Sequence, residues 1–150
     1  MKLTSPVVLI DDDRGWRETL SEYLQERGFD VRTAEVPSRG LRLLDEDDAK
    51  IAVIDYQMPE MNGLELLRRI RQRGRPVSVV VVSGEDDPDL AARLIMEGAQ
   101  AFLSKGTAPP LLLRKLVQML ALAVFETALE RILASRWDHL LPPPEEDRSS

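Results

Sequence analysis

The chain lacks cysteine and contains a single histidine, His139, in 150 residues. Without cysteine, disulfides, thiolate metal ligands and a thiol nucleophile are all excluded. One histidine near the end of the chain leaves almost no material for a zinc site or a Ser-His-Asp triad. The chemistry of this protein must therefore come from carboxylates, hydroxyls, amides and cationic side chains.

Long hydrophobic runs and an excess of positive charge are also absent. No apolar run approaches the roughly 20 residues of a transmembrane helix, and residues 1–6 are too short and too polar for a signal peptide. The formal net charge of −6 argues against a nucleic-acid-binding surface, which normally needs clustered positive charge. The length and the 43% hydrophobic content fit a globular domain with a proper core. We expect a cytoplasmic protein that binds neither membranes nor nucleic acid directly.

What the sequence does contain is an alternation of five short candidate strands with five segments of helical periodicity. The candidate strands span residues 7–10, 29–34, 51–54, 77–82 and 101–103; residues 29–34 alternate between apolar and polar, and the others are mostly apolar runs. Continuous runs rich in β-branched residues are typical of parallel strands covered on both faces. We therefore predict a doubly wound α/β fold, flavodoxin-like, with a five-stranded parallel sheet in the order 2-1-3-4-5. Glycines 28, 74 and 98 should end helices, and residues 45–48 should form a solvated loop.

Polar side chains follow the ends of four predicted strands: Asp11 with Asp12, Asp55, Ser83 and Lys105. Parallel strands point the same way, so these groups share one edge of the sheet, where the first and third strands are neighbours. Three close carboxylates repel one another and need a cation to stay ionised together. Oxygen ligands suit Mg²⁺, and a metal-bound carboxylate beside a hydroxyl and an ammonium is what phosphoryl transfer requires. Singly, Ser83 could cap a helix and Lys105 could be a surface lysine, but four compatible strand ends favour a joint role.

Four motifs occur in one order along the chain: VLIDDD, IDYQMPEMNG, VVSG and FLSK. With these motifs the chain resembles, over roughly residues 5–125, the receiver domain of bacterial two-component response regulators. The resemblance implies that Asp55 takes a phosphoryl group from the phosphohistidine of a sensor kinase or phosphotransfer protein. It implies a single-domain response regulator, a switch that catalyses only its own phosphorylation and dephosphorylation. Such a protein signals through conformational change and contact with a downstream protein target.

The same resemblance assigns metal ligands and phosphoryl contacts. Asp11 and Asp12, with Asp55 and the backbone carbonyl of Gln57, would hold Mg²⁺, with Mn²⁺ as a possible substitute. The other roles fall on residues of the later strands and loops. Ser83 and Lys105 would each bind a phosphoryl oxygen, Phe102 would be the switch aromatic, and Gln57 and Glu85 would tune the rate of dephosphorylation.

One position departs from the family pattern. The family usually has Lys-Pro joined by a cis peptide bond where this chain has Lys105-Gly106. A cis bond before a non-proline residue costs about 2.5 to 4 kcal/mol, so the lysine could be aimed differently. This leaves open a pseudo-receiver that binds partners without phosphorylation. A less favoured alternative is a phosphatase resembling the haloacid dehalogenases, with its nucleophile in Asp11–Asp13; in that case Asp55 would have no role.

The C-terminal part is predicted to be a long helix that begins at Pro109-Pro110. Its apolar residues are too many for one buried face, and Leu122, Phe125, Leu129 and Ile132 continue at spacings of three and four. We expect a receiver domain over residues 1–125, a helical extension over 126–141 for dimerisation or a partner helix, and a disordered tail over 142–150. The alternative is that the extension folds back on its own domain. Trp137, Leu140 and Leu141 could cap either arrangement, and His139 should be a surface residue.

Overall fold

The computed structural model describes residues 6–106 and 108–137 of the chain. Five parallel strands form one sheet in the order β2-β1-β3-β4-β5, which confirms the predicted fold class and strand order. The strands are β1 (Val7–Ile10), β2 (Val31–Ala34), β3 (Ile51–Asp55), β4 (Ser78–Ser83) and β5 (Ala101–Ser104). The expectations for the side chain of Trp137, for His139, Leu140 and Leu141, and for the tail over 142–150 lie outside the described residues.

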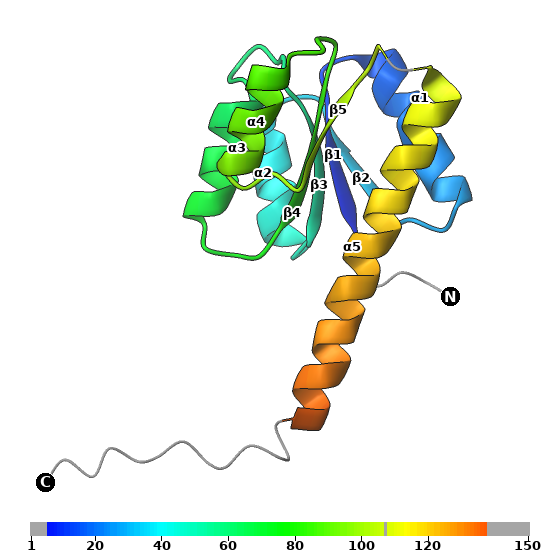
Figure 1. Cartoon of the computed structure of the whole chain (residues 1–150), viewed down its shortest axis with the longest axis vertical. Coiled ribbons are helices and arrows are strands. Elements are labelled where there is room, and N and C mark those ends of the chain that lie inside the picture. Colours follow the sequence, from blue (N-terminus) through cyan, green and yellow to red (C-terminus); the bar gives the residue numbers. More distant parts are fainter. Residues whose placement is uncertain (1–5, 107, 138–150) are drawn as a thin grey trace, which may run out of the picture.

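The helices cover both faces of the sheet (Figure 1). They are α1 (Arg14–Glu26), α2 (Pro37–Glu46), α3 (Gly63–Gln72), α4 (Pro88–Met96) and α5 (Pro109–Trp137). Alternate residues of β1, β3 and β4 point to opposite faces. One set packs on α2, α3 and α4, and the other packs on α1 and α5. The neighbouring interior strands β1 and β3 are buried along their whole length, as their continuous apolar sequences predict.

The strand boundaries agree with the sequence prediction to within one residue except at the start of the second strand, and one predicted loop is also partly wrong. The second strand begins at Val31 instead of Phe29, which is a buried core residue in the turn before it. The expected loop over residues 45–48 is wrong in its first half, because α2 continues through Glu46. Burial of Leu44 on the sheet keeps the chain helical to this point, and the acidic residues that follow remain on the solvent side.

Glycines end three of the helical segments as predicted. Gly28, Gly74 and Gly98 have φ values of 90°, 72° and 107°, a left-handed conformation that glycine adopts at little cost. A different constraint acts at Gly63, the first residue of α3. A Cβ atom at this position would lie 2.9 Å from the Cα of Tyr56, so the loop after β3 closes only with glycine there. That closure fixes the backbone directly after Asp55.

The last helix, α5, is one continuous helix of 29 residues. Its first half packs on the sheet beside α1 and buries Leu112, Leu116 and Leu120. The second half continues straight past the end of the sheet and away from the domain (Figure 1). The described part of the extension therefore does not fold back onto its own domain. Within the described residues, no helix combines the length and the apolar character needed to cross a membrane.

Candidate functional site

The acidic residues of the first and third strands meet at the carboxyl-terminal edge of the sheet. Asp11 directly follows β1 and Asp55 is the last residue of the neighbouring strand β3. Ligand oxygens of Asp11, Asp12 and Asp55 all lie within 4.8 Å of one another. Asp11 and Asp55 are buried, with 1% and 6% of their surface exposed, and Asp12 is open to solvent. The predicted convergence of these three carboxylates is thus present.

The electrostatics of this cluster favour a cation. Burial and the neighbouring charge of Asp11 raise the pKa of Asp55 from 3.8 to about 7. Burial also raises the pKa of Asp11, although the hydrogen bond from Lys105 opposes the effect. Three carboxylates that share one small site, with two of them buried, are a donor set for a hard divalent ion that retains some of its water. The residues present fit Mg²⁺.

Lys105 reaches into the same cluster from the end of β5. Its ammonium nitrogen lies 2.8 Å from Oδ2 of Asp11 and 3.5 Å from Oδ1 of Asp55. Its backbone N–H donates to the carbonyl of Ser83 at 2.6 Å, which ties the end of β5 to that of β4. No cis peptide bond occurs among the described residues, so Lys105 makes these contacts with a trans bond to Gly106.

Ser83 is the last residue of β4 and is fully buried at this edge of the sheet. Its hydroxyl oxygen accepts a hydrogen bond from the backbone N–H of Glu85 at 3.1 Å. The capping residue of α4 is Asp87, which accepts from the N–H groups of Asp89 and Leu90, so Ser83 does not cap that helix. Ser83 thus ends the strand next to β3, which carries Asp55 of the acidic cluster.

Gln57 and Glu85 lie on two loops above the same edge, after β3 and after β4. The side-chain amide of Gln57 donates to Oε1 of Glu85 at 3.1 Å, and both side chains are exposed. This bridge was not predicted, because the sequence does not show that the two loops approach each other. Phe102 on β5 is partly buried and packs against the core that α2, α3 and α4 cover.

Three residues of the segment after β1 contact the site although the receiver resemblance gave them no role: Asp13, Trp16 and Arg17. Asp13 caps α1 by accepting from the N–H of Trp16 at 3.1 Å, and its own N–H donates to Oδ1 of Asp11 at 2.9 Å. Arg17 donates to the backbone carbonyl of Asp11 at 2.8 Å. An aspartate just before a helical segment is a recognisable N-cap signal, whereas the contacts of Trp16 and Arg17 depend on the fold.

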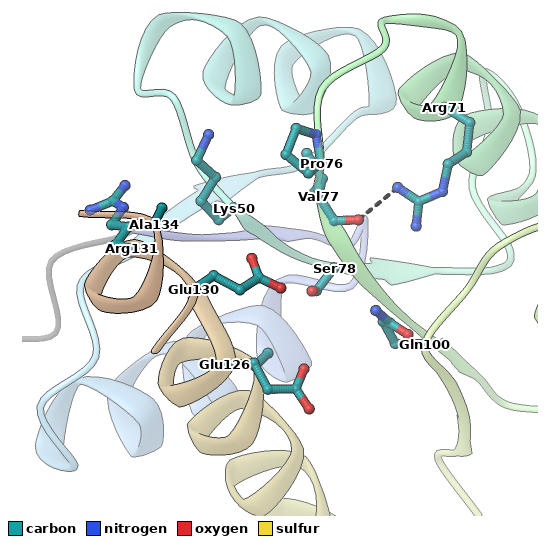
Figure 2. A pocket seen from close by; sticks show the side chains of 11 residues that line it. Lys50, Arg71, Pro76, Val77, Ser78, Gln100, Glu126, Glu130, Arg131 and Ala134 are labelled. Carbon is teal, nitrogen blue, oxygen red and sulfur yellow. Dashed lines mark hydrogen bonds between the residues drawn. The ribbon is translucent and has the colours of Figure 1, made fainter. Parts of the chain in front are cut away.

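A hollow of about 560 Å³ lies at the opposite edge of the sheet, far along the strands from Asp55. Figure 2 shows Glu126 and Glu130 of α5 on one side of it, and Ser78 at the start of β4 on the other. Arg71 on the far wall donates to the carbonyl of Val77 at 2.6 Å. The hollow separates the second half of α5 from the sheet and has no part in the acidic site.

The family model for the response regulator receiver domain matches residues 7–117, which include every strand and the whole acidic cluster. The chain belongs to this family. A two-component response regulator of rice, ORR3, is 33% identical over 106 residues, which cover 69% of this chain and 81% of that protein. The C4-dicarboxylate transport regulatory protein DctD of Rhizobium meliloti is 34% identical over 105 residues. This chain spans 23% of the length of DctD and 32% of the cyclic di-GMP phosphodiesterase of Thermotoga maritima.

The fold is also that of solved receiver domains. A CheY-like response regulator receiver domain protein from Methanospirillum hungatei superposes with a TM-score of 0.71 at 24% identity, covering 81% of this chain and 98% of that one. Membership of this family makes the chain a response regulator receiver domain.

Proposed function

We propose that this chain is a response regulator that is phosphorylated on Asp55 in a Mg²⁺-dependent reaction. The observation that carries the proposal is the position of Asp55: a buried carboxylate at a strand end, with its ligand oxygen within 4.8 Å of those of Asp11 and Asp12. Lys105, 3.5 Å from Asp55, supplies a positive charge at the same point. Asp11, Asp12, Asp55 and the backbone carbonyl of Gln57 would hold the metal ion, with Mn²⁺ as a substitute.

In the proposed reaction an oxygen of the Asp55 carboxylate attacks the phosphorus of a phosphohistidine on a sensor kinase or phosphotransfer protein. A new P–O bond forms, the P–N bond breaks, and the electron pair remains on the imidazole nitrogen. A bound divalent cation neutralises charge on the transferred group and keeps Asp55 ionised. Lys105 moves from Asp11 to a phosphoryl oxygen, and the hydroxyl of Ser83 donates to another. Gln57 and Glu85 limit the access of water to the phosphoaspartate and so set its lifetime.

The conformational output follows from the same contacts. As Ser83 binds the phosphoryl group, Phe102 turns further into the core beside it, and the surface made by α4, β5 and α5 changes. We propose that this surface binds a downstream protein target. We also propose the cytoplasm, where ATP-dependent kinases act, as the compartment of the protein.

The direct test is phosphorylation with acetyl phosphate and Mg²⁺, measured by intact mass and peptide mapping. We expect a mass increase of one phosphoryl group that requires the metal ion and disappears in Asp55→Asn. An exposed carboxylate outside the site provides the matched control, Asp30→Asn, which should label like the wild type. Failure of the folded wild-type protein to label in the presence of Mg²⁺ would support the pseudo-receiver alternative. Label that survives Asp55→Asn and disappears in Asp11→Asn would support the phosphatase alternative.

The projecting half of α5 supports a second proposal, that two copies associate through this helix. At 1.5 Å per residue the helix is about 44 Å long, whereas a strand of six residues spans about 20 Å, so roughly half of it extends past the sheet. Its exposed apolar residues include Leu122, Phe125, Leu129 and Ile132, with 41% to 62% of their surface exposed. Their spacing of three, four and three is that of a coiled-coil seam. A second copy of the same helix would cover this stripe.

Light scattering tests the association. We expect the wild type to be dimeric at micromolar concentration and Phe125→Glu to be monomeric but still folded, because this side chain lies outside the domain core. Replacing an exposed polar residue on the same helix, in Gln118→Glu, should leave the dimer intact. A wild type that stays monomeric at high concentration, with or without phosphorylation, would contradict this proposal.

A further inference from the structure

Trp16 stands beside the proposed phosphorylation site without a role in the chemistry described so far. It lies in the first turn of α1, and its backbone N–H donates to the capping carboxylate of Asp13 at 3.1 Å. The N–H of Asp13 in turn donates to Oδ1 of Asp11 at 2.9 Å. The other oxygen of Asp11 accepts from Lys105 at 2.8 Å. One carboxylate, Asp11, therefore connects the start of α1, where Trp16 is anchored, to the lysine at the end of β5.

The indole ring of Trp16 also contacts the ammonium group of Lys105 directly. The ammonium nitrogen of Lys105 lies 5.1 Å from the centroid of the ring, within the roughly 6 Å over which a cation is attracted to an aromatic face. Only 19% of the Lys105 side chain is exposed, so the contact is partly shielded from water and is stronger than on an open surface. The ring itself is half-buried and packs against the core under α1 and α5.

The indole N–H of Trp16 makes no favourable polar contact among the described residues, so the aromatic ring is the feature that favours tryptophan at this position. Nε1 is buried and has no hydrogen-bond partner among the described residues. A buried N–H without a partner is unfavourable, and a phenylalanine or a leucine would avoid that cost while filling much of the space. The contribution of tryptophan at this position must then come from its apolar area and from the negative face that it presents to a cation.

The position of the Lys105 ammonium group is only weakly fixed by its own chain. Its four-carbon stem is flexible, it is followed by glycine, and two carboxylates compete for its ammonium group, at 2.8 Å and 3.5 Å. We propose that Trp16 is a positioning residue for Lys105: its ring holds the ammonium group at the acidic cluster, ready to receive a phosphoryl oxygen on Asp55. This inference rests on the proposed function, because it assigns Lys105 the phosphoryl contact.

Two substitutions separate the ring face from simple packing. Trp16→Phe and Trp16→Leu both remove apolar volume and the unpartnered N–H, but only phenylalanine keeps an aromatic face. Cation–π contacts change an equilibrium by roughly 2-fold to 30-fold, depending on how dry the site is. We expect the initial rate of acetyl phosphate labelling at Asp55 to fall about 3-fold to 10-fold in Trp16→Leu, and to stay within about 2-fold of the wild type in Trp16→Phe. Equal losses in both variants would mean that Trp16 is only packing material, and would overturn the inference.

A second measurement is independent of phosphorylation. The chain has four lysines, so selective ¹³C labelling gives four ε-methylene signals, and Lys105→Arg identifies the relevant one. In the metal-free wild type the ring current of Trp16 should shift the Lys105 ε-protons upfield, and this shift should be lost in Trp16→Leu and partly kept in Trp16→Phe. An unshifted Lys105 signal in the wild type would overturn the placement. A shifted signal in a wild type that cannot be labelled would leave the placement standing and refute the proposed function instead.

Discussion

Replacing Asp55 by asparagine should stabilise the cation-free protein, by an amount that grows as the pH rises. The pKa of Asp55 is raised from 3.8 to about 7 by burial and by the charge of Asp11, so the folded state holds its proton more tightly than the unfolded state. Stability from a raised pKa is fully present below about pH 4 and is lost as the pH rises through 7. Each tenfold change in proton affinity corresponds to about 1.4 kcal/mol, so the loss above pH 7 reaches up to about 4 kcal/mol. Asparagine has no charge to bury and escapes this loss.

Urea unfolding of both proteins at half-unit steps from pH 4 to pH 8.5, with a chelator present, measures the effect. We expect nearly equal free energies of unfolding at pH 4, and an advantage for Asp55→Asn that rises by up to about 1.4 kcal/mol per pH unit to a plateau above pH 7. Asp30→Asn, at an exposed site, should follow the wild type throughout. An advantage that is independent of pH, or one that shrinks toward alkaline pH, would refute the electrostatic account of the cluster.

Three further outcomes follow from the same geometry. At pH 8, Mg²⁺ should raise the thermal midpoint of the wild type and should raise that of Asp55→Asn much less, as measured by calorimetry, because the ion removes the repulsion that the substitution has already removed. Lys105→Met should move the NMR-detected pKa of Asp55 further upward, since the ammonium group 3.5 Å away lowers it, and an unchanged pKa would contradict the ion pair. Gly63→Ala should lower the unfolding free energy in the same urea assay by about 1 to 3 kcal/mol, because its Cβ would lie 2.9 Å from the backbone of Tyr56. The control is Gly84→Ala, which should change it by less than about 0.5 kcal/mol because nothing lies within 4 Å of the added Cβ.

The order of strands and helices could be predicted because most strands are short apolar runs and three of the helices end at a glycine. Residues 7–10 and 51–54 are fully buried strands, and Gly74 and Gly98 take the left-handed conformation that ends a helix. The end of α2 could not be predicted in the same way. The acidic residues after Leu44 are typical of a loop, but the burial of that leucine decides the conformation. The direction of α5 past the sheet was equally open, since its apolar residues suit either a self-covered or a projecting helix.

The acidic cluster was predictable for a topological reason: residues that end neighbouring parallel strands must meet at one edge. The strand order alone was enough to predict that Asp11 and Asp55 lie close together. Contacts between a helix and a distant strand end are different, because they depend on how the helix is rotated about its axis. The indole of Trp16 over Lys105 and the guanidinium of Arg17 on the carbonyl of Asp11 are of this kind. The bridge from Gln57 to Glu85 depends in addition on the shapes of two loops.

The length of α5 has a mechanical consequence. Its first half packs on the sheet beside α1, and the projecting half, about 24 Å long, carries the apolar stripe. A tilt of the packed half by about 10° would move the far tip by about 4 Å, roughly three quarters of the pitch of one helical turn. A small repacking near the strand ends can thus displace the tip of α5 far enough to misalign two such helices. The tip lies farther from the strand ends than any side chain reaches.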